Sequence, residues 1–166
     1  MRNIKYKAWV HNSDLGEDVL QDVLQLDFSA NNGSFCVAHT RSLRQSDPFN
    51  LAMDSYDYDK VELLEFTGYY DIDGNEIYTG YIVRFAIPNP TGYENYDGEW
   101  VDTTEEEPCG EVVFKEGCYC VKYPNGELLP FNTPTSETNK APIIELFEVI
   151  GNIYENKELL EKERER

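Results

Sequence analysis

Short apolar runs separated by tight-turn sequences dominate this chain. Asn31-Asn32-Gly33, Asp73-Gly74-Asn75 and Lys115-Glu116-Gly117 each stand between stretches in which apolar and polar residues alternate. Asn-Gly and Asp-Gly pairs are typical of tight β-hairpin turns. Alternation with a period of two places one side of a strand in a core and the other in water. The sequence therefore predicts a mainly β protein.

The pattern predicts nine strands and few helices. The expected strands are Ile4–Val10, Leu24–Phe28, Ser34–Thr40, Lys60–Thr67, Ile77–Phe85, Gly110–Phe114, Cys118–Tyr123, Leu128–Phe131 and Ile143–Tyr154. The segment 17–25 is ambiguous, because its apolar residues also fit one helical face, and we favour a short helix or irregular lead-in there. Asn156 is placed to cap a final helix that begins at Lys157.

These elements predict a mainly β fold with a minor α+β component. We expect an N-terminal α+β subdomain over residues 1–60, a small closed β-barrel over 61–155, and a helical tail over 156–166. Gly80 interrupts the strand Ile77–Phe85, which indicates a bulge or sharp bend. The expected barrel core includes Ile77, Ile82, Val112, Phe114, Ile150 and Ile153.

Negative charge restricts the classes of function. The formal net charge of the chain is −18, and the 65 residues from Gln45 to Cys109 hold 16 acidic and two basic residues, a net −14. Such a surface repels phosphate and anionic lipid. The remaining roles for the negative charge are binding of a cation, binding of a basic protein patch, and solubility. No apolar run is long enough for a membrane span or a signal peptide, so we expect a cytoplasmic protein that binds no membrane.

The segment from Ala86 to Cys109 is the longest expected loop, and it holds seven acids and no base. Aromatic side chains alternate with carboxylates in it. The candidate partner-binding residues are Tyr93, Glu94, Tyr96, Asp97, Trp100 and Asp102. Aromatic rings beside carboxylates suit a basic peptide through apolar and cation–π contacts. The alternative is a solvated insertion.

Four cysteines raise the question of a metal site. Cys118 and Cys120 are two residues apart in a predicted strand, so their side chains point to the same face. With Cys109 and either His11 or His39 they match the donors of a zinc site. The C-x-C spacing is weaker than paired C-x-x-C, and we favour small buried side chains of reduced cysteines instead.

No motif indicates a catalytic centre or a cofactor. Asp71, Asp73 and Asn75 begin like a calcium loop, but Glu76 and Ile82 stand where an EF-hand loop needs Gly and Glu, so a hairpin turn is favoured. The chain has no nucleophile elbow, no P-loop and no dinucleotide fingerprint. The expectation is a protein that is not an enzyme and that holds no cofactor or metal, with two structural or solvated histidines.

Five separated segments together resemble the YopX family of phage and prophage proteins. They are Ile4–Trp9, Phe66–Gly68 with Asp71–Phe85, Gly110–Phe114, Glu148–Asn156 and Glu158–Leu160. The resemblance covers most of the chain. It implies an SH3-like C-terminal barrel after an N-terminal α+β or β part, and a protein made in the cytoplasm of a bacterial host. It brings no activity, because the family's function is unknown.

Two departures from the family pattern stand out. Such proteins usually read Glu-Gly-Asp where this chain has Thr79-Gly80-Tyr81, and they often have Pro where this chain has Lys157. The leading hypothesis is a phage accessory protein that acts by protein–protein binding or self-assembly, with an unknown and basic partner. One alternative is an acidic DNA mimic that inhibits a host nucleic-acid enzyme. Another is nucleic-acid binding by the barrel, which the charge disfavours.

Overall fold

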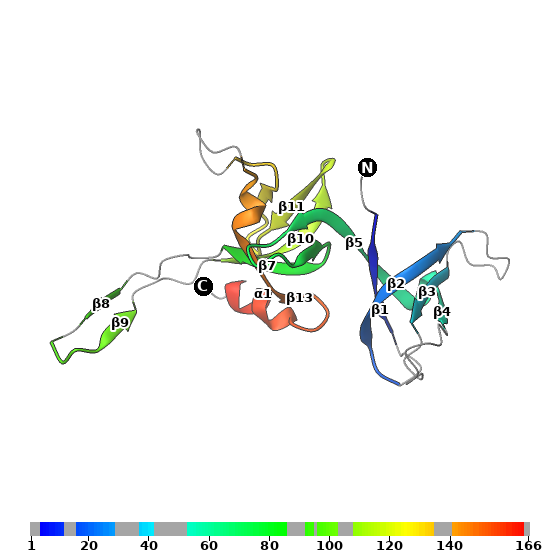
Figure 1. The fold of residues 1–166 in the computed structure, drawn as a ribbon, viewed down its shortest axis with the longest axis horizontal. Coiled ribbons are helices and arrows are strands. Elements are labelled where there is room, and N and C mark those ends of the chain that lie inside the picture. Colours follow the sequence, from blue (N-terminus) through cyan, green and yellow to red (C-terminus); the bar gives the residue numbers. More distant parts are fainter. Residues whose placement is uncertain are drawn as a thin grey trace. The chain divides into compact units, whose positions relative to one another are not determined.

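The structure is a computed structural model that describes residues 4–11, 16–28, 37–41, 53–85, 92–94, 96–102, 108–134 and 141–164. The chain divides into two compact units, Met1–Gly68 and Tyr69–Arg166. Figure 1 shows their elements along the chain, from blue to red. The three-part division at residues 60 and 155 stays a prediction of the sequence.

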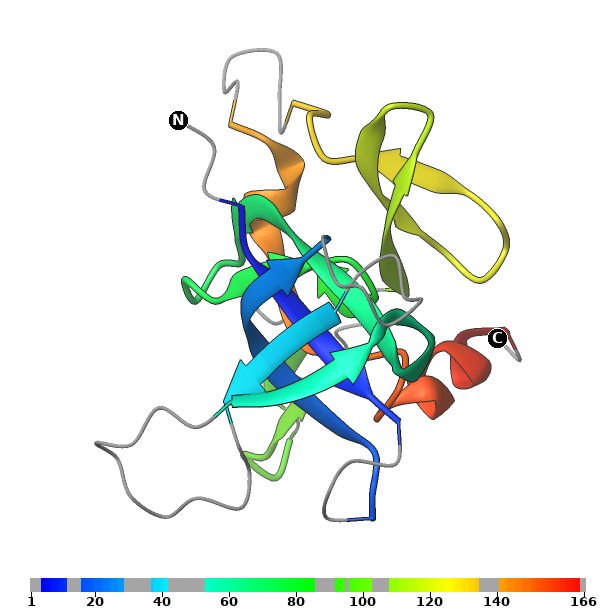
Figure 2. The same cartoon turned by 90° about the vertical axis from the view of Figure 1, so that its right-hand side faces the viewer.

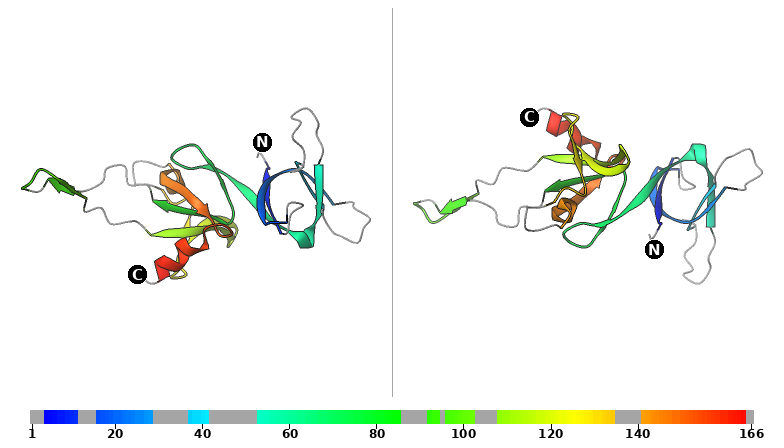
Figure 3. Two further views of the ribbon diagram at one scale, coloured as in Figure 1. Left: turned by 90° about the horizontal axis from the view of Figure 1, so that it is seen from below. Right: turned by 90° about the horizontal axis from the view of Figure 1, so that it is seen from above.

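The first unit is a curved antiparallel sheet. Its strands and one short 3-10 helix are β1 (Tyr6–Val10), β2 (Val19–Asp27), β3 (Val37–Arg41), β4 (Met53–Asp57), η1 (Tyr58–Lys60) and β5 (Val61–Tyr70). The strands lie side by side in the order β4-β3-β2-β1-β5. Strand β6 (Glu76–Tyr78) is the next strand of the same sheet, beside β5. Figure 2 shows β1 to β4 side by side, and Figure 3 shows their curvature.

Strand pairing explains which residues of this unit are buried. Val10 lies opposite Val61 and Ala8 opposite Leu63, so the apolar residues of β1 and β5 share one face, as alternation predicts. Ala8, Val10, Ala38 and Val61 form the core of the unit on that face.

The second unit is built on a five-stranded antiparallel sheet in the order β12-β11-β10-β7-β13. Its strands are β7 (Tyr81–Phe85), β10 (Cys109–Lys115), β11 (Cys118–Lys122), β12 (Leu128–Pro130) and β13 (Phe147–Asn152). Glu116 and Gly117 have φ values of 51° and 84°, as a tight hairpin turn between β10 and β11 requires. This hairpin confirms the turn predicted from Lys115-Glu116-Gly117.

Two helical segments lie on opposite sides of this second sheet (Figure 3). They are the 3-10 helix η2 (Ile143–Leu146) and the α-helix α1 (Lys157–Arg164). The core lies on the η2 side and consists of Ile77, Val83, Val112, Val121, Phe131, Ile144 and Phe147. Of the predicted core, Ile77, Ile82 and Val112 are fully buried, whereas Phe114 is 56% exposed. That prediction was wrong for Phe114, which lies near the hairpin end of β10, next to the turn.

The prediction of a mainly β protein with a C-terminal helix from Lys157 is confirmed. The prediction of a short helix near the N-terminus was wrong, because residues 19–27 form strand β2. Backbone pairing with β1 and the β-branched side chains of Val19 and Val23 favour a strand there. The described residues of the first unit contain no α-helix.

The prediction of a closed barrel was also wrong, because both sheets are open, and the SH3-like character stays a prediction. The predicted strand 77–85 is two strands, β6 and β7, which belong to different sheets. Gly80, at φ +78°, turns the chain between them, and the edge strands β12 and β13 do not pair. Among the described residues, no helix is long and apolar enough to cross a membrane.

Candidate functional site

The six predicted partner-binding residues lie together in one β-hairpin. Its strands are β8 (Gly92–Glu94) and β9 (Trp100–Asp102). Tyr93 pairs with Val101, and Glu94 pairs with Trp100. The expected loop between Ala86 and Cys109 therefore contains ordered strand pairing that the sequence analysis missed.

The hairpin forms a separate two-stranded sheet. Among the described strands, β8 and β9 pair only with each other. Tyr96 is fully exposed at the hairpin end, and Asp97 and Glu99 beside it are exposed as well. A lone two-stranded hairpin is marginally stable in water.

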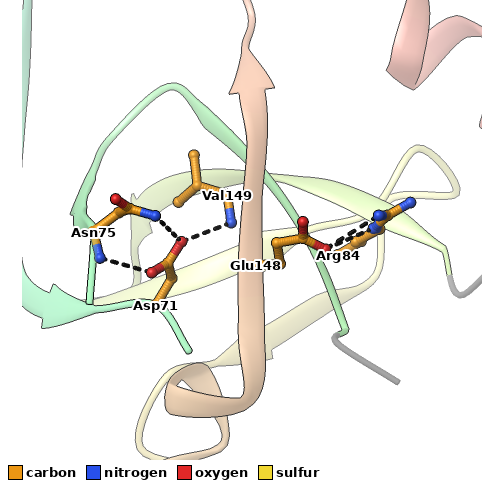
Figure 4. Close-up of polar contacts among 5 residues, drawn as sticks. All are labelled: Asp71, Asn75, Arg84, Glu148 and Val149. Carbon is orange, nitrogen blue, oxygen red and sulfur yellow. Dashed lines mark hydrogen bonds and ion pairs between the residues drawn. The ribbon is translucent and has the colours of Figure 1, made fainter. Parts of the chain in front are cut away.

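The side chain of Asp71 accepts four hydrogen bonds, and the residue is 5% exposed. Its Oδ1 accepts hydrogen bonds from the backbone N–H groups of Asn75 (2.7 Å) and Asp73 (3.0 Å). Its Oδ2 accepts from the Asn75 amide (3.0 Å) and from the Val149 backbone N–H (3.1 Å). Figure 4 shows the bonds from Asn75 and Val149 to Asp71, which join the turn after β5 to strand β13.

The surroundings of Asp71 fix its charge. Burial raises the pKa of its carboxyl, but the hydrogen bonds from Asn75, Val149 and Asp73 outweigh burial and hold the pKa below its usual value. A carboxylate whose oxygens already accept four hydrogen bonds is a poor general base or acid. The turn is the hairpin predicted between Asp71 and Asn75, with Gly74 at φ +84°.

Close packing explains why residue 151, in the stretch Val149-Ile150-Gly151-Asn152, is a glycine. A Cβ on Gly151 would lie 2.4 Å from Asn156 Oδ1, and this oxygen accepts a hydrogen bond from the Asn152 backbone N–H (3.2 Å). Asn152 Oδ1 in turn accepts from the N–H groups of Tyr154 (3.0 Å) and Glu155 (2.9 Å). The Asn156 side chain thus stabilises the turn before α1, and the cap of the helix start stays a prediction.

The cysteines do not gather as the zinc alternative requires. Cys118 and Cys120 do share a face, with their sulfurs 3.6 Å apart, and burial raises the pKa of the Cys120 thiol to about 11. Cys109 is buried, and its sulfur lies 3.6 Å from the Leu159 carbonyl oxygen. In the described part of the chain, no three His, Cys, Asp or Glu side chains are grouped as metal ligands. Cys36 lies outside the described residues.

The two histidines make local contacts in the first unit. His11 Nδ1 lies 3.3 Å from Asp18 Oδ2, and His39 Nδ1 lies 2.8 Å from Ser55 Oγ. Both pairs are on exposed parts of the sheet. Exposed pairs of this kind contribute little to stability.

A cleft between α1 and the second sheet was not predicted. It has a volume of about 370 Å³ and is lined by Glu111, Ile153, Lys157, Leu160, Glu161 and Arg164. A smaller cavity of about 50 Å³ shares Glu111, Leu160 and Arg164 and adds Lys122, Tyr123 and Pro124. The only sequence signal for it is Glu111, a carboxylate within the apolar run of β10.

A surface ion pair lies on the same sheet. Arg84 on β7 contacts Glu148 on β13 through Nε and Nη2, each 3.1 Å from Oε2 (Figure 4). Both side chains are more than a third exposed, so the pair aligns neighbouring strands without providing a site.

The chain is a mainly β protein that consists of two open antiparallel sheets, an acidic hairpin and a short helix at the C-terminal end. Its fold is shared with the crystal structure of protein EF1440 from Enterococcus faecalis, at a TM-score of 0.54 and 17% identity over 96% of this chain and 99% of that chain. No curated protein matches the chain.

The family follows from the sequence itself. The family model described as YopX protein matches residues 5–161. The chain therefore belongs to the YopX family, as its five motif segments indicated.

Proposed function

We propose that this chain is a phage- or prophage-encoded accessory protein that acts in the host cytoplasm by binding another protein and is not an enzyme. The observation that carries the proposal is the β8–β9 hairpin, whose strands pair only with each other among the described strands and which combines an exposed aromatic tip with negative charge. The partner is a protein with a basic surface.

The charges of the hairpin support this partner class. Residues 92–102 contain Glu94, Asp97, Glu99 and Asp102 and no basic residue. Complementary charge speeds encounter and selects orientation, and an aromatic anchor supplies most of the affinity. Tyr96 is the aromatic residue at the exposed tip.

The structural roles of the family motifs also support a binding role. Asp71, Gly151 and Asn152 all serve the turns and strand ends of the second unit. Side chains used in this way are explained by folding, so the motifs need no reaction to account for them.

We expect a photo-crosslinker placed at position 96 to capture a discrete partner from extract of the bacterial host. The same crosslinker at Asn125, an exposed turn of the same unit, is the matched control. Reversal of two charges with Asp97→Lys and Glu99→Lys should lower the yield of the adduct at least about tenfold, since like charges then face the basic partner.

The outcome distinguishes the hypotheses. Identical adducts from positions 96 and 125, or none from position 96 across infection stages, would contradict the proposal. A captured protein that uses the same surface to bind DNA would instead support the DNA-mimic alternative. A second copy of this chain in the adduct would indicate self-assembly.

A further inference from the structure

The cleft between α1 and strand β10 combines charges of both signs around an apolar wall. Lys157, Leu160, Glu161 and Arg164 are spaced i, i+3, i+4 and i+7 along α1, so they share one face of the helix. Glu111 faces them from the sheet, and Ile153 and Leu160 supply the apolar part of the lining. At about 370 Å³ the cleft is within the size range of small-molecule sites.

The charges that line the cleft are not neutralised by one another. Within the described residues, no hydrogen bond or ion pair joins the side chains of Glu111, Lys157 and Arg164 to one another. The Glu111 side chain is nonetheless half-buried. The positive charges of Lys122 and Lys115 act on this carboxylate, but no hydrogen bond replaces the water that burial removes from it.

The direction of the pKa shift of Glu111 agrees with this geometry. Burial raises the pKa of the Glu111 carboxyl, while Lys122 and Lys115 oppose the rise. An ammonium group placed against Glu111 would restore the interactions of the charged form.

The sign pattern restricts the ligand. A plain anion would meet Lys157 and Arg164 but would add a third negative charge to those of Glu111 and Glu161 in the lining. A plain amine would pair with Glu111 but would be repelled by the two cations. A molecule with both an amine and a carboxylate complements both sides.

We propose that this cleft binds a small zwitterion with an apolar body, of the size of an amino acid or a dipeptide. Its amine pairs with Glu111, its carboxylate pairs with Lys157 and Arg164, and its apolar part lies on Leu160 and Ile153. Glu111, Ile153 and Leu160 come from three of the five segments that carry the family resemblance. The site is independent of the hairpin, so either proposal can fail alone.

Calorimetric titration of the full chain tests the proposal with L-leucine and L-leucyl-L-leucine as probes. The controls are 3-methylbutylamine, which lacks the carboxylate, and 4-methylpentanoate, which lacks the amine. We expect saturable binding of at least one zwitterion, about tenfold or more tighter than either control, because each control loses one charge-assisted contact.

Variants assign the binding to this cleft. Glu111→Gln and Arg164→Gln should each weaken binding of the zwitterion about tenfold. Lys162→Gln on the same helix lines neither cavity and should leave binding unchanged. Arg164 is exposed near the end of α1, so its variant folds even where Glu111→Gln is unstable.

Three results would overturn the proposal. They are no binding of either zwitterion, equal binding of the singly charged controls, and wild-type affinity in both Glu111→Gln and Arg164→Gln. The comparison of ligands uses the wild-type chain alone, so it decides the question even if a variant unfolds.

Discussion

Replacement of Asp71 by alanine is expected to destabilise the second unit by about 3–4 kcal/mol, because it removes the acceptors of several buried donors at once. The Val149 N–H and the Asn75 N–H would both lose their partner. The first of these donors lies on β13, 78 residues away in the chain. The loss therefore loosens the contact between the turn and the edge of the sheet.

Hydrogen exchange measured by mass spectrometry checks this prediction, since it follows the two units separately. Peptides of β7, β10 and β13 should exchange faster in Asp71→Ala, and those of β1 to β3 should not change. Asp73→Ala is the matched control: it removes an exposed carboxylate from the same turn and should cost less than about 0.5 kcal/mol. Equal effects of the two variants would contradict the structural role of Asp71.

The lowered pKa of Asp71 makes this contribution depend on pH. Because the carboxyl has a lower pKa in the folded state, its charge stabilises the fold fully above the unfolded pKa of about 3.9. The stabilisation is lost as the pH falls through the lower, folded pKa. The difference in unfolding free energy between wild type and Asp71→Asn should thus be constant at neutral pH and shrink only below about pH 4. A difference that grows on acidification would contradict the assigned sign.

Tight turns were predictable from local chemistry alone. Glu116-Gly117 and Asp73-Gly74 each place a glycine at positive φ, and side chains with the right turn preference surround them. Such turns need no distant contact to be recognised, so the hairpins β5–β6 and β10–β11 follow directly from sequence.

Elements that depend on distant pairing were not predictable. Residues 19–24 match a helical face and a strand almost equally well, and pairing of β2 with β1 and β3 decides the outcome. Strand β4 has no clear alternation, yet it pairs with β3 along its whole length. Closure into a barrel likewise depends on whether edge strands meet, which spacing along the chain does not reveal.

The acidic hairpin and the cleft differ in how far they could be predicted from the sequence, for the same reason. The acidic hairpin is continuous in sequence, so its residues could be named in advance. The cleft joins Glu111 to residues of α1 about 50 positions later, and it exists only because the helix packs on β10, with Cys109 against Leu159. A single charged residue in an apolar strand is too weak a signal to predict that packing.

Gly110→Ala is expected to destabilise the second unit by about 3 kcal/mol, close to the effect of Asp71→Ala, because the added methyl group has no space. A Cβ at position 110 would lie 2.5 Å from Val121 Cγ1 and 2.9 Å from the Lys122 carbonyl oxygen. The valine is fully buried, and the oxygen belongs to the backbone of β11, so neither yields easily.

A matched glycine separates this contact from backbone effects. Gly126 has φ +90° with no atom within 4 Å of an added Cβ, so Gly126→Ala should cost only about 1 kcal/mol from left-handed strain. Removing the valine side chain should relieve part of the clash at position 110 but not the contact with the Lys122 oxygen. In the Val121→Ala background the cost of Gly110→Ala is therefore expected to fall without vanishing, as measured by a double-mutant cycle on the exchange of β10 and β11 amides. If the costs of Gly110→Ala and Val121→Ala were fully additive in that cycle, β10 and β11 would separate at this point. Close packing would then not be the reason for glycine at position 110.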